Sequence, residues 1–208
     1  MNCTLCNTPL LKKPEEEYYN CPVCRAWVKD RSLYLTPEEE KLRYQTHNND
    51  INDPRYRKFT SPITNVIFEN FGVQHEGLDF GSGTGPVISG VLKEAGYNVK
   101  QFDPYFANEP GLLELHYDYI FACEVVEHFY DPAKEFEQLF TMLKPGGKLI
   151  LMTHLYEENI DFNTWYYRKD PTHVFIYSRE TFQYIAAKFG FEKPEIKDRL
   201  VVLSRKPV

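Results

Sequence analysis

From residue 77 onward, short apolar runs alternate with longer amphipathic segments, and this alternation constrains the fold more than any other feature of the chain. Strands are expected at 78–80, 98–102, 118–125, 148–153 and 199–206. Helices are expected at 86–96, 131–147 and 178–191. This order predicts an α/β fold: a Rossmann-like, open and mostly parallel sheet with helices on both faces.

The turn after the first expected strand, in LDFGSGTGPV at 78–87, can bring the backbone close to a ligand. Gly81 and Gly83 carry no Cβ that would hold the ligand away. A dinucleotide fingerprint requires glycine at position 86, where this chain has Pro86, and no Lys-Ser or Lys-Thr follows as a phosphate loop requires. What remains is an acid, one residue and GxGxG, and the acid, Asp79, suits a cationic ligand.

A second acid, Asp103, ends the next expected strand, where a carboxylate can accept hydrogen bonds from the hydroxyls of a ribose. S-adenosylmethionine carries an ammonium, a sulfonium and a ribose, so it fits both acids. We therefore expect it to be the cofactor. The residues predicted to bind it are Asp79, Gly81, Ser82, Gly83, Asp103 and Cys123.

Residues 77–205 resemble class I S-adenosylmethionine-dependent methyltransferases, with LDFGSGTG as the first motif and DYIFACEVVEHF and LKPGGKLIL as later landmarks. Nearly the whole chain, including RYQTHNND and YYRKDPTHVFIYS, resembles a bacterial group of these enzymes. The departure lies between Asp103 and Asp118, where the family usually has another strand and an acid near the adenine. FANEPGLLELHY is short and irregular there, so Cys123 and Glu124 are the nearest candidates to line the cofactor.

Two CxxC pairs, Cys3 with Cys6 and Cys21 with Cys24, lie near the N-terminus. Together they supply four thiolates for one tetrahedral zinc ion, which leaves no open position and so predicts a structural role. The alternatives are chance pairs or a redox centre. The segment between the pairs, 7–20, is expected to form a hairpin with a polar tip.

The chain is expected to divide into three parts: a zinc-ribbon-like domain at 1–35, a helical linker at 36–75 and a methyltransferase domain at 76–208. Thr36 and Pro37 begin a helix that should fade near 48–50, and a second helix is expected at 62–70. Tyr44, His47 and Asn48 are predicted either to fold over the cofactor or only to pack the linker.

The pentapeptide EVVEH places Glu124, Glu127 and His128 on one face if it forms a helical turn, and His173 lies on a loop before a later helix. These four residues could ligate Mg²⁺ or Mn²⁺. EVVEH resembles the metal-binding segment of small-RNA 2′-hydroxyl methyltransferases, THVFIYSRETF resembles the segment that brings their last histidine, and ubiquinone-pathway O-methyltransferases have a similar element.

The other interpretation of EVVEH needs no metal. Its charges would cap the next helix or hold the loop, or Glu127 and His128 would act directly, with His128 as general base. The candidate catalytic residues are His128, Glu127 and His173. Within the insertion at 154–177, Trp165, Tyr166, Tyr167 and Arg168 are predicted either to stack on a planar substrate and hold an anionic group or to pack as core.

The net charge of −6 comes mainly from residues 61–208, and no dense basic face is evident, which argues against nucleic acid. We expect O-methylation of a small or carrier-linked acceptor. One alternative is an RNA methyltransferase, since a zinc ribbon on this fold resembles the layout of a ribosomal-RNA guanine methyltransferase. The basic ribbon residues that favour RNA are Lys12, Lys13, Arg25, Lys29 and Arg31.

A second alternative is a non-catalytic S-adenosylmethionine-binding adapter, and an oxidoreductase is disfavoured by Pro86. No apolar run reaches the roughly 20 residues that a membrane helix needs, so no membrane partner is expected. The N-terminus lacks the order of a signal peptide, which predicts a cytoplasmic location.

Overall fold

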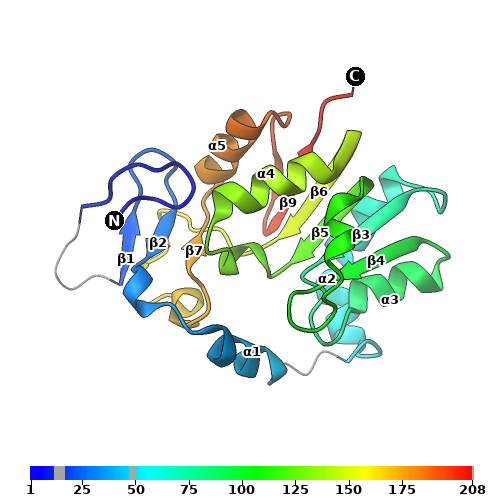
Figure 1. The fold of residues 1–208 in the computed structure, drawn as a ribbon, viewed down its shortest axis with the longest axis horizontal. Helices are drawn as coiled ribbons and strands as arrows, with labels where there is room; N and C mark the ends of the chain where they lie inside the picture. Colours follow the sequence, from blue (N-terminus) through cyan, green and yellow to red (C-terminus); the bar gives the residue numbers. More distant parts are fainter. Residues whose placement is uncertain (12–16, 47–49, 208) are drawn as a thin grey trace.

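A computed structural model of the protein describes residues 1–11, 17–46 and 50–207. Its central sheet has six strands in the order β4–β3–β5–β6–β9–β8 (Figure 1). The strands β3, β4, β5 and β6 run parallel to one another, and β9 pairs antiparallel with β6 and β8. The strands are β3 (Glu76–Phe80), β4 (Asn98–Phe102), β5 (Tyr117–Cys123), β6 (Leu143–Met152), β8 (Glu195–Lys197) and β9 (Leu200–Ser204).

Helices cover both faces of this sheet, as predicted. On one face, α2 (Pro54–Asn70) and α3 (Val87–Glu94) pack against Tyr119 and Phe121 of β5. On the other face, α4 (Pro132–Met142) and α5 (Arg179–Phe189) pack against Ile120 and Ala122 of the same strand. Successive side chains of a strand point to opposite faces, so one apolar strand supplies two cores. The Rossmann-like fold is confirmed.

The helix predicted at 62–70 is longer than expected, because α2 begins at Pro54 with Asp53 as its N-cap and continues through Pro62. An internal proline leaves the carbonyl four residues earlier without its N–H partner. Here that carbonyl belongs to Lys58, and it accepts a hydrogen bond from the Ser61 hydroxyl at 2.8 Å. The neighbouring side chain thus satisfies the group that would otherwise break the helix.

Two further boundaries differ from the prediction. The helix expected at 131–147 ends at Met142, and the Pro-Gly-Gly segment at 145–147 lies within β6 rather than stopping a helix. Between Asp103 and Asp118 the structure has the 3₁₀ helix η2 (Pro110–Glu114), and β4 forms one edge of the main sheet. The described residues between β4 and β5 form no strand, in agreement with the irregular sequence of this segment.

The cysteine pairs belong to a second, three-stranded sheet made of β1 (Tyr18–Asn20), β2 (Trp27–Lys29) and β7 (Phe175–Ile176). The hairpin therefore surrounds the second CxxC pair, since β1 pairs with β2, whereas a hairpin was expected at 7–20. The tip of that expected hairpin, 12–16, lies outside the described residues. The sequence also gave no sign that β7, about 150 residues away, would complete this sheet.

Helix α1 (Pro37–Gln45) follows the short 3₁₀ helix η1 (Arg31–Leu33) and begins after Thr36, as predicted. The structure adds a capping box, which Thr36 forms with Glu39. Its expected end near 48–50 falls largely outside the described residues. Figure 1 shows α1 running below the carboxyl side of the sheet, between the ribbon and α2. The domain boundaries proposed above stay a prediction. Within the described residues, no helix is long and apolar enough to cross a membrane.

Candidate active site

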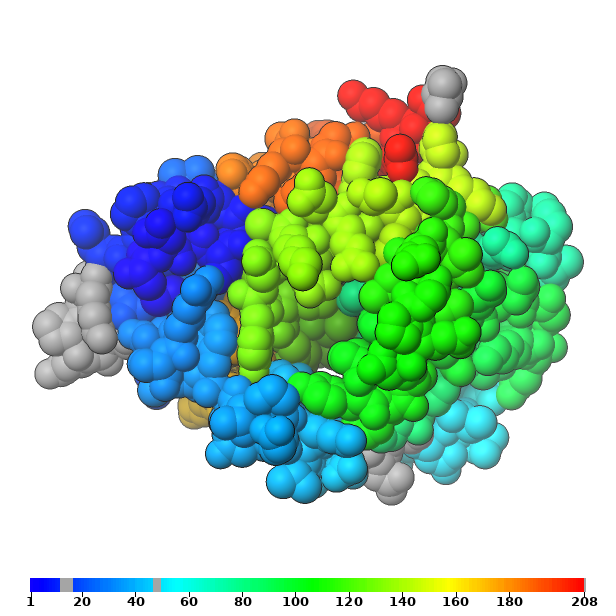
Figure 2. Space-filling model, viewed as in Figure 1, coloured from blue at the N-terminus to red at the C-terminus, as the bar shows by residue number. Residues whose placement is uncertain are grey.

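A cavity of about 810 Å³ lies at the carboxyl ends of β3, β4 and β5, next to the point where the strand order reverses. Figure 2 shows the hollow on this face, between α1 and the segments coloured green. The glycine turn, Asp103 and the end of β5 form its walls, and α1 and α2 close it from the other side. It is large enough for a nucleoside-sized ligand.

Both glycines of the turn adopt a backbone conformation that other residues rarely take, with φ of 81° at Gly81 and 62° at Gly83. A Cβ at Gly81 would come within 2.6 Å of the Val125 side chain, so this position has no room for one. At Gly83, which lines the cavity, no described residue other than its chain neighbours lies within 4 Å of such a Cβ. The turn thus brings bare backbone to the cavity wall.

Asp103 is fixed by three backbone N–H groups. Its Oδ2 accepts a hydrogen bond from Gly83 at 2.9 Å, and its Oδ1 accepts from Tyr105 at 2.8 Å and Phe106 at 3.0 Å. A carboxylate has about four lone-pair positions, so capacity remains for a ligand hydroxyl. The structure therefore holds Asp103 in one orientation at the cavity wall, where the sequence predicts a ribose contact.

Asp79, Ser82 and Cys123 also line the cavity, as predicted for cofactor-binding residues. The Ser89 hydroxyl donates to Asp79 at 2.7 Å, and burial raises the pKa of Asp79 to about 7. Burial likewise raises the pKa of the Cys123 thiol. A carboxyl that is costly to ionise in an apolar wall is stabilised by an arriving cation. The binding roles of these residues stay predictions.

Helix α1 contributes a buried carboxylate that the sequence analysis missed. Glu40 accepts hydrogen bonds from the hydroxyls of Tyr44 at 2.9 Å and Tyr105 at 2.8 Å, and all three residues line the cavity. Arg43 binds Asp170 at 2.8 Å, which joins α1 to the insertion. Of the two placements predicted for this helix, the structure shows the one over the cavity. His47 and Asn48 lie outside the described residues.

Three of the four residues predicted to bind a second metal come together. Glu127, His128 and His173 each place one ligand atom within 4.8 Å of the others. Glu124 is not part of this set, because the helical turn expected at 124–128 begins only after it, as the 3₁₀ helix η3 (Val126–His128). Glu124 itself has a φ of 54°, a left-handed conformation that turns it off the shared face.

In the described part of the chain, each of the two imidazoles makes its hydrogen bond through Nδ1 and none through Nε2. Nδ1 of His128 donates to the Thr172 carbonyl at 3.0 Å, and Nδ1 of His173 donates to the Tyr167 carbonyl at 2.6 Å. A carbonyl only accepts, so the proton is on Nδ1 and the lone pair is on Nε2. Metal-binding histidines are held in this way in many proteins.

Glu127 is fully buried, and a hydrogen bond also fixes the orientation of its side chain. Its Oε2 accepts from the Thr153 hydroxyl at 3.0 Å, which is in turn 2.9 Å from the Tyr167 hydroxyl. Its Oε1 has no hydrogen-bond partner among the described residues. A buried, unpartnered carboxylate oxygen beside two imidazole lone pairs fits a cation, because each of these atoms is an electron-pair donor.

Glu124 lies between this cavity and a second one of about 450 Å³, and it lines both, as do Asp170 and His173. Its buried Oε1 also has no hydrogen-bond partner among the described residues, and Arg199 is 3.9 Å away. Burial and the nearby Glu127 raise the pKa of Glu124 to about 8. The second cavity thus reaches the same group of side chains from another side.

The aromatic residues of the insertion divide between core and surface. Tyr167 is buried, and Trp165 packs with it at a ring distance of 5.1 Å. Tyr166 is 64% exposed and lines the second cavity, so it remains the aromatic candidate for a substrate contact. Arg168, predicted to hold an anionic substrate group, binds Glu17 of the ribbon at 2.7 Å instead.

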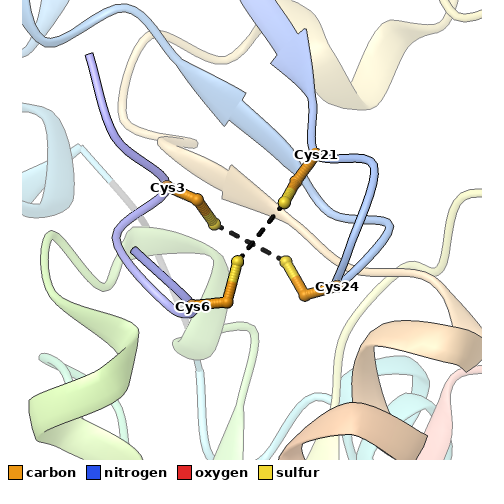
Figure 3. Close-up of side chains that lie close together, drawn as sticks. All are labelled: Cys3, Cys6, Cys21 and Cys24. Carbon is orange, nitrogen blue, oxygen red and sulfur yellow. Dashed lines mark hydrogen bonds between the residues drawn. The ribbon is translucent and has the colours of Figure 1, made fainter. Parts of the chain in front are cut away.

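The four N-terminal cysteines converge as the sequence predicts (Figure 3). The sulfur atoms of Cys3 and Cys24 are 3.5 Å apart, and those of Cys6 and Cys21 are 3.4 Å apart. These distances exceed the roughly 2 Å of a disulfide bond. The cluster could bind zinc, because four thiol sulfurs around one centre are a tetrahedral ligand set for that ion.

The basic residues that would favour an RNA substrate are less available than their number suggests. Lys29 is buried, and its ammonium donates to the Pro171 carbonyl at 2.8 Å. Arg25 and Arg31 are exposed. Lys12 and Lys13 lie outside the described residues.

A family model described as a methyltransferase domain matches residues 46–195, which is most of the chain. No curated protein matches the chain in sequence. Many solved structures share its fold. Human N-acetylserotonin methyltransferase in complex with S-adenosylmethionine is 14% identical with a TM-score of 0.56, and the match covers 83% of this chain and 57% of that one.

Two other structures give similar values. An O-methyltransferase family protein from Burkholderia thailandensis is 14% identical with a TM-score of 0.54, covering 81% of this chain and 63% of that one. Phosphoethanolamine N-methyltransferase 2 from Haemonchus contortus, in complex with S-adenosylmethionine, is 19% identical with a TM-score of 0.53, covering 66% and 38%. This chain therefore spans less than two thirds of each of the three proteins. At these identities the likeness shows the fold.

Proposed function

Since the chain belongs to the methyltransferase domain family, we propose that it uses S-adenosylmethionine to methylate an oxygen atom of a small or carrier-linked acceptor, with the help of a divalent metal ion. The observation that carries this proposal is the position of the Glu127, His128 and His173 cluster. His128 and His173 line the cofactor cavity, and His173 also lines the second cavity. A cofactor and an acceptor can therefore meet at one group of side chains.

We place S-adenosylmethionine in the larger cavity, in the orientation that the two acids suggest. Its ribose hydroxyls would bind Asp103, whose carboxylate is already held by the turn. Its methionine end would lie along the glycine turn, where the ammonium faces Asp79. The sulfonium methyl would then point toward the end of β5, where Glu124 and His128 line the wall. Both neighbours that contain the cofactor share this fold, which supports the placement.

The placement predicts that cofactor affinity rises with pH between 6 and 7.5. Burial raises the pKa of Asp79 to about 7, so the carboxyl is mostly neutral at pH 6 and mostly charged at pH 7.5. The charged form binds an ammonium, so the dissociation constant should fall about fivefold to tenfold over this range. Isothermal titration at both pH values measures this, and Asp79→Asn should remove the dependence. An equal slope in the variant would place the ammonium elsewhere.

The acceptor would enter through the second cavity, past the exposed Tyr166, and bring its hydroxyl between Glu124 and His173. S-adenosylmethionine, when bound, would supply the methyl group: the acceptor oxygen would displace the sulfur from the methyl carbon, and S-adenosylhomocysteine would be released. The hydroxyl proton would pass to Glu124, because its Oε1 accepts no hydrogen bond from the described residues and its pKa of about 8 suits a base near neutral pH. These residues mainly align the reactants and exclude water.

A metal ion, when bound by Glu127, His128 and His173, would lower the pKa of the acceptor hydroxyl and orient it. The residues fit such an ion, because Oε1 of Glu127 has no hydrogen-bond partner in the described part of the chain and both Nε2 atoms carry lone pairs. The cluster has two imidazoles and one carboxylate, whereas the predicted four-residue site had two carboxylates. Because Mg²⁺ prefers oxygen ligands and Mn²⁺ also accepts imidazole, this set favours Mn²⁺. If no metal binds, Nε2 of His128 is free to act as the base.

Replacing Glu127 with glutamine is expected to weaken Mn²⁺ binding by more than roughly 100-fold. Loss of a residue that only orients a ligand costs up to about that much, and Glu127 would bind the ion directly. The amide keeps the shape of the side chain and removes its charge. Electron paramagnetic resonance of free Mn²⁺, titrated into zinc-loaded protein, measures the affinity. Glu137→Gln, an exposed position on α4, is the matched control. Wild-type protein that takes up no Mn²⁺ would contradict metal assistance and leave direct base catalysis.

RNA is the alternative acceptor, because the exposed Arg25 and Arg31 of the ribbon provide positive charge. RNA that co-purifies with the protein, as an excess of absorbance at 260 nm lost at high salt, would favour it. A small or carrier-linked acceptor predicts protein free of RNA at low salt. Turnover of S-adenosylmethionine by fractionated small molecules and by total RNA compares the two classes directly.

A further inference from the structure

The ribbon, residues 1–11 and 17–35, is bonded to the loop that presents His173, which we define as residues 168–174. The backbone N–H of Lys29 donates to the Val174 carbonyl at 2.9 Å. The buried Lys29 ammonium donates to the Pro171 carbonyl at 2.8 Å. The backbone and the side chain of Lys29 thus both hold the loop, at positions on either side of His173.

Tyr18 on the neighbouring strand β1 holds the same loop. Its hydroxyl lies 2.6 Å from the His173 carbonyl and 3.2 Å from the Arg168 carbonyl. The Arg168 guanidinium packs over the Tyr18 ring at 5.4 Å and binds Glu17 at 2.7 Å. A loop fixed at 168, 171, 173 and 174 by one small sheet cannot move independently of that sheet.

The hydrogen bonds continue from the loop to Glu127. The Val174 N–H donates to the Glu127 carbonyl at 2.9 Å, and the Tyr177 hydroxyl donates to the Val126 carbonyl at 2.9 Å. The segment around β7 therefore lies between the ribbon strand β2 on one side and η3 on the other. His173 and Glu127, which are 46 positions apart in the sequence, are joined through this segment.

The cysteine cluster is packed into the same core. Cys21 and Cys24 are fully buried, in one apolar cluster with Phe175 and Tyr177. Lys188 of α5 donates to the Leu5 carbonyl beside the first cysteine pair at 2.5 Å. The cofactor turn is held differently, because the N–H groups of Gly81 and Gly83 bind Phe102 and Asp103 of the main sheet.

We infer that the ribbon positions the acceptor side of the active site, with Lys29 and Tyr18 as positioning residues for His173 and Glu127. This inference rests on the proposed function, because those two residues belong to its metal cluster. The ribbon holds the loop at 168–174 and the loop holds η3, whereas the hydrogen bonds of the cofactor turn come from Phe102 and Asp103. Loss of the ribbon contacts therefore uncouples metal binding from cofactor binding.

The test compares Lys29→Met and Tyr18→Phe with two matched controls, in zinc-loaded full-length protein. Arg25→Met removes an exposed cation from the same hairpin, and Tyr19→Phe removes the neighbouring hydroxyl, which bonds to Asp30 within the ribbon at 2.8 Å. Three quantities are measured: hydrogen exchange of the peptide 168–177, Mn²⁺ affinity and S-adenosylmethionine affinity.

Both test variants should speed exchange in 168–177 and weaken Mn²⁺ binding by about 10- to 100-fold, as loss of an outer-shell partner does. S-adenosylmethionine affinity should stay within about twofold of wild type, and both controls should behave as wild type. Unchanged exchange at 168–177 in Lys29→Met and Tyr18→Phe would overturn the inference.

Two results separate this inference from the proposed function. Wild-type protein without Mn²⁺ affinity would contradict the proposed metal, and hydrogen exchange would then decide the inference alone. If circular dichroism shows that Lys29→Met has lost its fold, Tyr18→Phe decides, because it keeps the packing of the ring; a folded Lys29→Met that loses cofactor affinity would overturn the inference. Cofactor affinity lost in a folded Tyr18→Phe would overturn the inference, since the cofactor side would then depend on the ribbon.

Discussion

Replacing Asp103 with alanine is expected to raise the dissociation constant for S-adenosylmethionine about 100-fold or more. Hydrogen bonds to a charged group contribute roughly 1.5–3 kcal/mol each, and the carboxylate can accept two from a ribose. The substitution also releases the N–H groups of Gly83, Tyr105 and Phe106, which now hold the carboxylate. Isothermal titration of the cofactor and of S-adenosylhomocysteine into both proteins measures the change.

Two variants show whether the effect belongs to the site. Asp103→Asn keeps one oxygen acceptor and loses the charge, so its affinity should fall between those of wild type and Asp103→Ala. Asp118→Asn is the matched control, because that carboxylate lies at the opposite end of β5, where it binds Lys144 at 2.9 Å. Wild-type affinity in Asp103→Ala would mean that the ribose lies elsewhere in the cavity.

Removal of zinc is expected to produce the largest loss of stability. The four cysteines of the cluster should hold one zinc ion per chain, measured by inductively coupled plasma mass spectrometry. Structural zinc contributes on the order of 10 kcal/mol, comparable to the whole stability of a typical domain. In a protein of this size each kcal/mol shifts Tm by about 2–4 °C, so chelation should lower Tm by more than roughly 10 °C.

Cys24→Ser should have the same effect, because its sulfur is fully buried within the cluster. Cys123→Ser is the matched control, since Cys123 lies at the cofactor cavity and outside the cluster. It should retain both zinc and Tm. A purified protein that contains no zinc and keeps its Tm in the presence of a chelator would contradict a structural zinc site.

Much of the fold was predictable because its signals are local. The apolar runs placed β3, β4, β5 and α5 nearly at their observed bounds, and Thr36 and Ser178 begin helices as caps. The prediction was wrong where a side-chain contact offsets the effect that a residue normally has on its own helix. Pro62 suggested a helix start, but the Ser61 hydroxyl satisfies the carbonyl that the proline leaves free. That bond depends on side-chain geometry, which residue type alone does not report.

The candidate site was predictable in part. The cysteine cluster, the glycine turn and Asp103 come from short motifs whose spacing dictates their geometry. Glu124 was placed on the wrong face, because a helical turn was assumed where its backbone is left-handed. Glu40 was missed because nothing in an acidic helix start distinguishes a buried carboxylate from exposed ones.

The sequence by itself determined the order of strands and helices, the nature of the cofactor turn and the convergence of four cysteines. These depend on residue periodicity and on ligand spacing over a few positions, which the chain carries locally. Only the tertiary structure decided that α1 closes the cavity, that Lys29 is buried and that β7 joins the ribbon to the cluster of Glu127, His128 and His173. The physical reason is that an apolar face shows that a helix or strand must pack against another one. Which one it packs against depends on long-range packing, which local sequence does not report.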